Sequence, residues 1–264
     1  MSDPRRSEFG DFLRSRRQKL TPHAAGLPDG RRRRTPGLRR EEVAELAGIG
    51  VDWYVRLEQG RAVSPSAATV EALARALRLG AAEHAHLRAL ARDGGRRAWS
   101  LETVPDPVRR LVESLPHPAY VTGRRWDVLA WNAAASDTFG DFGAFPEPER
   151  NILLFVLAMP EGRRLFGDAW EEEARRMVAQ FRAVHDLWAA DPAFRDLLAR
   201  LRGADSSFSG PGFATWWDAH DVRTGSSGRK VLHHPERGVL RFEYSTFQCN
   251  DDSALRLAIY MPAS

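Results

Sequence analysis

The sequence predicts two domains: an all-α domain of five short helices over residues 1–93 and an α+β domain over residues 105–264, joined by a linker at residues 94–104. Two short apolar helical patterns separated by glycines lie within Leu38–Gly60. The stretch Asp93–Arg97, rich in glycine and arginine, then interrupts the helical periodicity. Beyond it, two strand-like segments, a block of helices and three more strand-like segments follow. This order predicts one antiparallel five-stranded sheet with its helices on one face.

Leu38–Gly60 has the pattern of a helix-turn-helix motif. Apolar residues recur at helical spacing on each side of the glycine-bounded turn at residues 48–50. Ala44, four residues before the turn, is small enough for two helices to approach closely. Gly60 is suited to end the second helix. In such a motif the second helix lies in the major groove of DNA.

Apolar spacing predicts three more helices in the first domain. They cover Ser7–Leu20, a stripe at Val70, Leu73, Ala74 and Leu77, and Glu83–Ala91. Between the first of these helices and the motif, Thr21–Gly37 contains several Gly and Pro residues. We therefore expect a long basic loop there and no helix.

Positive charge is concentrated at the start of the chain. Residues 1–40 contain twelve Arg or Lys and four Asp or Glu, whereas the whole chain has a net charge of +4. Four consecutive arginines, Arg31, Arg32, Arg33 and Arg34, lie in the expected basic loop. We interpret them as an arm that contacts DNA phosphates, because clustered arginines gain from counterion release. A solvated charged loop is the alternative.

The outward-facing residues of the second helix are candidates for contact with bases. Arg56 suits a guanine through its guanidinium fork, and Val51 suits a thymine methyl group. Asp52 either accepts from a cytosine amine or caps the helix. Trp53 either packs against the sugar-phosphate wall or joins the core.

Two arginines precede the first helix of the motif. Arg39 and Arg40 are placed for phosphate or base contact, because the start of this helix touches DNA in the motif. The expected partner is a double-stranded DNA operator. Since proteins of this type read two half-sites, we also expect a homodimer.

The second domain alternates between strand and helix signals in a definite order. Strands are expected at Ala119–Thr122, Trp126–Trp131, Lys230–His233, Val239–Phe247 and Leu255–Met261. Helices are expected at Asp106–Leu115, Asn132–Phe139, Arg150–Leu157, Arg163–Leu187, Asp191–Leu201 and Phe213–His220.

Large aromatic residues are frequent in the second domain. A packed core explains most of them; the functional interpretation is a cavity between sheet and helices with a few polar groups that orient a ligand. An arginine there suits a carboxylate head group through a bidentate pair. The candidate ligand-binding residues are Trp126, Trp131, Asn132, Arg150, Asn151, Phe155, Arg164, Trp170, Trp217, His220 and Tyr244.

The sequence contains no clear pattern of catalytic or metal-ligating residues, so we expect no enzymatic activity and no metal site. The single cysteine, Cys249, excludes an internal disulfide and lacks a local histidine partner. His233 and His234 are adjacent in an expected strand and point to opposite faces, which disfavours chelation of one ion. The longest apolar run, Ile152–Met159, is too short to span a bilayer, which needs roughly 20 residues. The start of the chain lacks the apolar segment of a signal peptide, so we expect a cytoplasmic protein.

The stretch RTPGLRREEVAELAGIGVDWYVRLEQGR closely resembles the repressor-like helix-turn-helix of the XRE class. The later segments LPHPAYVTGRRWDVLAWN, ERNILLFVLAMP, RRLFGDAW, WWDAHDV and HHPERGVLRFEY resemble successive blocks of the MmyB-like regulators of actinomycetes. One departure is Ala169, which separates Asp168 from Trp170 where the family pattern has Asp-Trp. The resemblance covers nearly the whole chain and implies a transcription regulator whose PAS-like domain binds a small apolar ligand.

The function expected from both arguments is sequence-specific DNA binding controlled by that ligand. The resemblance implies a fatty acid as the effector class, and no other cofactor is expected. Two alternatives for the second domain stay open. It serves only dimerisation or protein interaction, or it is a redox or haem sensor that uses Cys249 or a histidine.

Overall fold

The computed structural model describes residues 4–28, 37–61, 64–92, 98–204, 212–225 and 227–263. The chain divides into two compact units. Unit 1 contains Met1–Ala98, Phe181–Arg195 and Trp217–Arg223, and unit 2 contains the rest of the chain. Two segments that the sequence analysis assigns to the second domain therefore lie in unit 1 together with the N-terminal helices.

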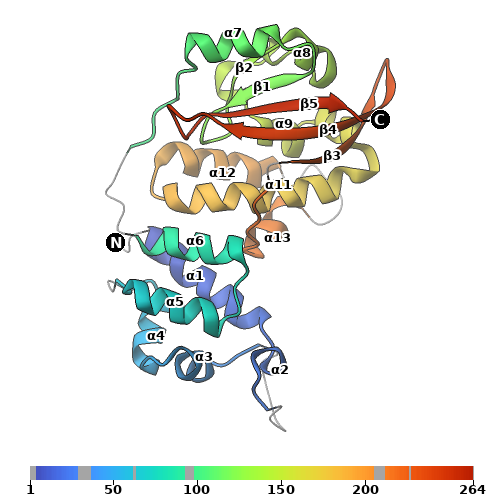
Figure 1. Ribbon diagram of the computed structural model, residues 1–264. Coiled ribbons are helices and arrows are strands. Elements are labelled where there is room, and N and C mark those ends of the chain that lie inside the picture. Colours follow the sequence, from blue (N-terminus) through green and yellow to red (C-terminus); the bar gives the residue numbers. More distant parts are fainter. Residues whose placement is uncertain are drawn as a thin grey trace. The chain divides into compact units, whose positions relative to one another are not determined.

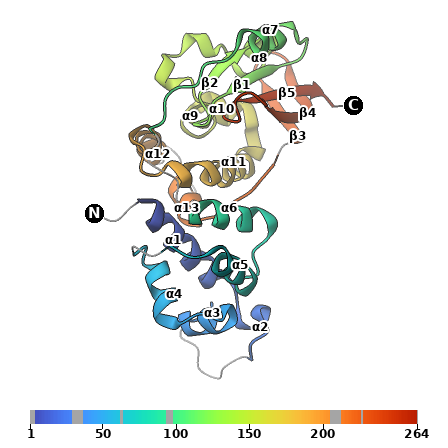
Figure 2. The same cartoon turned by 60° about the vertical axis from the view of Figure 1, so that its left-hand side comes forward.

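Unit 1 is helical around a helix-turn-helix motif, as the sequence predicts (Figures 1 and 2). Its N-terminal helices are α1 (Pro4–Lys19), α2 (Pro22–Ala25), α3 (Arg40–Ala47), α4 (Val51–Glu58), α5 (Ala67–Ala76) and α6 (Ala81–Ala91). The core between them contains Phe12, Leu13, Tyr54, Leu73 and Leu87, all of which are fully buried. Packing of these apolar faces fixes α4 against α1 and α3.

The turn between α3 and α4 has the predicted chemistry. Gly48 follows α3 with φ +64°, a left-handed conformation that glycine adopts without strain. Ala44 is fully buried beneath the turn. At the other end of α3, the backbone N–H of Arg39 donates to Glu42 Oε2 at 2.7 Å. The first bond caps the start of α3, and the left-handed Gly48 ends the helix and lets the chain turn into α4.

One expectation for unit 1 is wrong. The stretch expected to be a loop, Thr21–Gly37, contains the short helix α2. The Thr21 hydroxyl accepts from the Ala24 N–H at 3.2 Å, Pro22 occupies the first helical position, and Gly26 ends the helix with φ +82°. Capping groups at both ends thus stabilise one helical turn within a composition that otherwise disfavours helix.

Unit 2 is built on one antiparallel five-stranded sheet in the order β2-β1-β5-β4-β3. The strands are β1 (Ala119–Thr122), β2 (Val128–Trp131), β3 (Ser227–His234), β4 (Gly238–Gln248) and β5 (Arg256–Pro262). Tyr120 pairs with Ala258, and Tyr244 pairs with Tyr260. Because directly paired residues share a face, this register gathers tyrosines from three strands on one side of the sheet.

The helices of unit 2 lie on both faces of the sheet, which corrects the expectation of one face (Figure 1). Helix α7 (Asp106–Ser114) covers β1 and β2 on the face opposite the tyrosines. Val112 packs there against Ala119, Val121 and Leu257. The small and β-branched residues at alternate positions of β1 make room for this helix.

The remaining helices follow the predicted order. They are α8 (Ala133–Phe139), α9 (Ile152–Ala158), α10 (Pro160–Phe166), α11 (Trp170–His185), α12 (Pro192–Ala204) and α13 (Phe213–Asp218). The predicted helix Arg163–Leu187 is broken in the structure. Gly167, with φ +53°, ends α10, and a 3-10 turn (η3, Gly167–Ala169) precedes α11. Within the described residues, no helix has the length and apolarity to cross a membrane.

Candidate functional site

The outer face of α4 carries the residues predicted to contact bases. Val51, Asp52 and Arg56 are exposed there. Gly50 is the N-cap of the helix, so Asp52 is its second residue and does not hold the capping position. Trp53 is half-buried and packs against the core of unit 1. The exposed residues share one surface of the motif, and their contact with DNA stays a prediction.

A buried carboxylate stands behind this surface. Glu58, the last residue of α4, has a fully buried side chain. Arg17 donates to both of its oxygens at 2.8 Å, and Arg40 donates to Oε1 at 3.0 and 2.8 Å. Burial alone would raise the pKa of Glu58, but the hydrogen bonds and charges of Arg17 and Arg40 outweigh it and lower the pKa.

This arrangement defines what the predicted arginines of α3 do in the structure. Arg40 is only partly exposed, because its guanidinium is held by Glu58. Arg39 is exposed at the start of the helix. The four arginines of the predicted arm, Arg31 to Arg34, lie outside the described residues. The sequence analysis did not predict that Glu58 is a buried ion-pair partner. A charged side chain on the apolar face of the helix was the pattern that could have indicated it.

In unit 2, a cavity of about 80 Å³ lies between the tyrosine face of the sheet and α11. Tyr120, Tyr244 and Tyr260 line it from the sheet, and Met177 and Ile152 supply apolar surface from the helices. The Tyr120 and Tyr260 hydroxyls are hydrogen-bonded at 3.0 Å. Burial raises the pKa of Tyr120 to about 12, so this hydroxyl remains a neutral donor and acceptor across the physiological range.

The polar end of this cavity contains two cations that share one carboxylate, and a third cation, Arg256, also lines the cavity. Lys230 of β3 and Arg176 of α11 line it, and both bind Glu173 of α11. The Arg176 Nη2–Glu173 Oε2 distance is 2.6 Å, and Arg176 also donates to the Tyr244 hydroxyl. With two positive charges against one negative charge, this end of the cavity has an excess positive charge.

Burial determines the ionisation of Lys230. The side chain is almost fully buried, and desolvation lowers its pKa to about 8, although Glu173 acts in the opposite direction. Its ammonium also lies 4.8 Å from the centre of the Tyr244 ring and 5.1 Å from that of Phe166. Both are cation–π distances, which favour the charged form.

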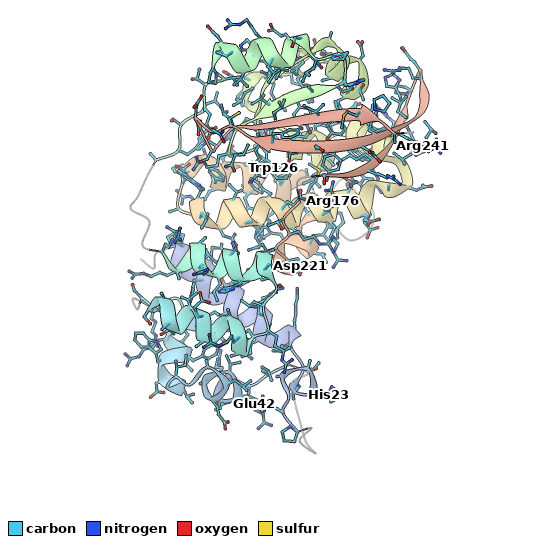
Figure 3. The ribbon with its side chains drawn as sticks, viewed as in Figure 1. His23, Glu42, Trp126, Arg176, Asp221 and Arg241 are labelled. Carbon is cyan, nitrogen blue, oxygen red and sulfur yellow. The ribbon has the colours of Figure 1, made fainter. Side chains whose placement is uncertain are left out.

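Trp126, one of the predicted ligand residues, lines the same cavity, and its backbone is strained. Figure 3 labels Trp126 and Arg176, which also lines the cavity. The φ of Trp126 is +69°, which is unfavourable for a residue with a β-carbon. The backbone is held there, since its N–H donates to Gly123 O and its carbonyl accepts from the Ile152 N–H. Tyr244 and Trp126 are the two predicted ligand residues that the structure brings together in this cavity.

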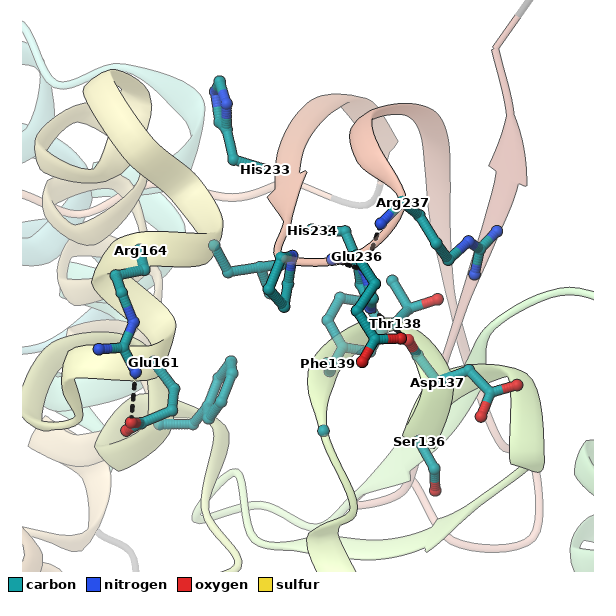
Figure 4. Close-up of a pocket in the computed structure, with 14 residues that line it drawn as sticks. Ser136, Asp137, Thr138, Phe139, Glu161, Arg164, His233, His234, Glu236 and Arg237 are labelled. Atoms are coloured by element: carbon teal, nitrogen blue, oxygen red, sulfur yellow. Dashed lines mark hydrogen bonds and ion pairs between the residues drawn. The ribbon is translucent and has the colours of Figure 1, made fainter.

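Four other predicted residues line separate hollows of unit 2. Trp131 and Arg150 lie at a cavity of about 250 Å³. Phe155 and Arg164 lie at an open pocket of about 910 Å³ (Figure 4). Arg164 is exposed there and forms an ion pair with Glu161 at 2.7 Å.

The remaining predicted ligand residues have structural contacts. Asn132 and Asn151 are the N-caps of α8 and α9, and both are buried. The Trp170 indole donates to the Val156 carbonyl at 2.7 Å. Trp217 and His220 belong to unit 1, where both accept hydrogen bonds from Arg182. The structure therefore distributes the predicted set over several sites.

The charged residues of the tyrosine-lined cavity were not among the ligand-binding residues predicted from the sequence. No role was predicted for Lys230 or Arg176. The available signal was strand alternation: Lys230 stands at an inward position of β3, two residues before the buried Leu232. The position of Arg176 in a long amphipathic helix gave no comparable signal.

Comparison with known families agrees with both halves of the fold. Residues 104–264 match the family described as MmyB-like transcription regulator ligand binding domain, and residues 8–87 match the family described as helix-turn-helix domain. No curated protein matches the chain. The first match covers more than half of the 264 residues. The chain therefore belongs to the MmyB-like family and is a DNA-binding transcription regulator with a ligand-binding domain.

Proposed function

We propose that this regulator changes its affinity for an operator when an acidic, largely apolar small molecule binds the tyrosine-lined cavity of unit 2. The observation that carries the proposal is a pair of cations, the buried Lys230 and the partly buried Arg176, which share the carboxylate Glu173. A ligand carboxylate would complete the charge balance of this site. Fatty acids, the effector class implied by the family resemblance, have this head group.

The size of the cavity limits how such a ligand is held. A volume of about 80 Å³ admits a carboxylate head group, whereas pockets for whole small molecules have roughly 300–1,000 Å³. A longer tail therefore requires part of the apolar wall to move. Trp126 is the candidate, because its left-handed backbone stores about 1–3 kcal/mol that a conformational change can release.

The DNA-binding part of the proposal rests on α3 and α4. A homodimer would place two copies of α4 in successive major grooves, about 34 Å apart along the duplex. Arg56 and Val51 would read bases, while Arg39 and the Arg31–Arg34 block would contact phosphates. The four arginines would give this binding a strong dependence on salt concentration.

Extraction of the purified full-length protein followed by mass spectrometry tests the ligand class. We expect a bound organic acid, and in its absence we expect added C6–C18 fatty acids to bind and to raise the melting temperature. Lys230→Met and Arg176→Met should each weaken this binding at least tenfold. Arg164→Gln, which alters an arginine at the 910 Å³ pocket, is the matched control and should bind normally.

Other outcomes would overturn the proposal. A bound haem or metal would favour the sensor alternative for the second domain. If no molecule is bound and no acid of the series binds or raises the melting temperature, the second domain would serve only dimerisation or protein interaction. Loss of binding in Arg164→Gln alone would move the ligand to the larger pocket.

A further inference from the structure

A buried arginine connects the N-terminal helices of unit 1 to segments from much later in the chain. Arg182, near the end of α11, is 1% exposed. Its guanidinium donates to the Trp217 carbonyl at 2.7 Å and to His220 Nδ1 at 2.9 Å, and it contacts Glu8 of α1 at 3.3 Å. The guanidinium carbon lies 4.1 Å from the centre of the Trp217 ring. All these residues belong to unit 1.

Asp186 forms the second part of this cluster. It lies in the 3-10 turn η4 (Asp186–Trp188) after α11 and is fully buried. Its carboxylate lies 3.3 Å from Arg182 Nη1, 3.1 Å from His86 Nε2 of α6 and 3.3 Å from His185 Nδ1. An ionised carboxylate can only accept hydrogen bonds, so His86 Nε2 and His185 Nδ1 each carry a proton here. The cluster thereby joins α1 and α6 to the segment Phe181–Arg195.

The charges of this cluster do not balance at high pH. Two carboxylates, Glu8 and Asp186, face one guanidinium, Arg182. The cluster is neutral when one carboxyl group is protonated, and burial makes that state favourable. Glu8 is the group that takes the proton, because Asp186 accepts more hydrogen bonds. Arg182, His86 and His185 all donate to Asp186, whereas among the described residues Arg182 alone is bonded to Glu8.

The titration of Glu8 follows from its neighbours. Burial is the largest cause and raises its pKa to about 7; the charges of Asp186 and Asp11 act in the same direction, and Arg182 opposes them. His86, His185 and His220 also border the cluster. Burial and the charge of Arg182 lower the pKa of His220 to about 4. The pKa of Asp186 is lowered, since Arg182, His185 and His86 together outweigh its burial.

Several features make this contact weaker than an apolar core. Among the described residues, His86 Nδ1, His185 Nε2 and Arg182 Nε are buried and have no hydrogen-bond partner. Each such atom costs free energy in the closed state. His220 has φ +51°, a strained value for this residue. The contact is therefore suited to open and close.

We propose that the α1–α6 surface is a proton-dependent latch that holds Phe181–Arg195 and Trp217–Arg223 in the DNA-binding unit. Protonation of Glu8 closes the latch, and ionisation of Glu8 loosens it. Helix α11 supplies Arg176 to the ligand cavity and Arg182 to the latch, so the same helix serves both. The latch requires neither DNA nor a ligand, so its test does not depend on whether the proposed function is correct.

Hydrogen exchange of the full-length protein between pH 6 and 8 tests the latch. The readout is the protection factor of amides in residues 181–195, compared between wild type and Glu8→Gln, whose neutral side chain mimics the protonated group. We expect the ratio of the variant's protection to that of wild type to rise about tenfold over these two pH units. Comparison with the variant cancels the contribution of His220, whose titration affects both proteins alike.

Two controls make the result decisive. Amides of α3 should show no such change, because opening of the latch differs from unfolding of the unit. Glu45→Gln, an exposed carboxylate of the same unit, should behave as wild type. An equal ratio at pH 6 and pH 8, or a parallel change throughout unit 1, would overturn the proposal.

Discussion

Arg40 at the start of α3 donates two hydrogen bonds to Glu58 at the end of α4, at 3.0 and 2.8 Å. Arg17 of α1 binds the same carboxylate through two further bonds of 2.8 Å. One buried carboxylate thus joins three helices and fixes how α4 is presented. Because Arg17 is also largely buried, these charges depend on one another.

Replacement of Glu58 by Ala should strongly destabilise unit 1. The change leaves Arg17 buried without its carboxylate, which costs about 3–5 kcal/mol for a pair of this kind. Chemical denaturation monitored by circular dichroism measures the loss. Glu45→Gln, on the exposed side of α3, should shift stability by less than about 0.5 kcal/mol. Equal stability of Glu58→Ala and wild type would show that the buried bonds contribute little.

Arg56→Ala should weaken binding to the preferred operator and reduce discrimination at one base position. A bidentate arginine–guanine contact contributes about 1–3 kcal/mol of discrimination. Arg39→Ala should instead weaken binding to all sequences about equally and reduce the salt dependence. Binding titrations against an operator and its single-base variants separate the two effects. A uniform loss for Arg56→Ala would assign it to the backbone.

Because the pKa of Lys230 is lowered, we expect protein stability and ligand affinity to depend on pH. Its pKa is lowered from 10.5 to about 8 by burial, so the folded protein binds fewer protons than the unfolded chain between these values. Stability should therefore rise as pH increases from 8 to 10.5, relative to a Lys230→Met variant. Affinity for an anionic ligand should fall above pH 8, by up to about tenfold per pH unit. A flat affinity profile would exclude the ammonium from binding.

Asn132→Ala should reduce stability without altering ligand affinity in the folded protein. The side chain accepts from the N–H groups of Ala119 and Ala135 and donates to the carbonyls of Leu115 and His117. Loss of these bonds should cost about 2–4 kcal/mol, more than a simple cap, because several buried groups lose their partner. Thermal unfolding and ligand titration on the same sample measure both effects. Weaker ligand binding by Asn132→Ala with unchanged thermal stability would show instead that Asn132 contacts the ligand.

Most elements of the fold could be predicted from local patterns. Short stretches of sequence were enough to predict the apolar faces of α3 and α4, the turn at Gly48 and the order of the strands. The helix α2 escaped prediction because its stability comes from capping by Thr21 and Gly26 within an unfavourable composition. The position of α7 depends on which face of β1 carries small residues, and the sequence pattern alone does not say which helix covers them.

The candidate site was predicted less well, for a physical reason. Aromatic residues such as Trp131 and Trp170 are equally suited to a core and to a cavity, so residue type does not separate the two. Lys230 and Arg176 lie 54 residues apart in the chain and meet only through the fold. The segments around Arg182 and Trp217 join unit 1 through long-range contacts, which no local periodicity indicates.

Control of DNA binding by an acidic ligand is measured as the operator affinity of the full-length protein with and without a C14–C18 fatty acid. Lys230→Met serves as the matched variant in the same titration. We expect the affinity of wild type to change by about fivefold or more, the lower end of typical coupling, and the affinity of Lys230→Met not to change. Equal affinities in wild type with and without the acid would contradict ligand control by this class of molecule.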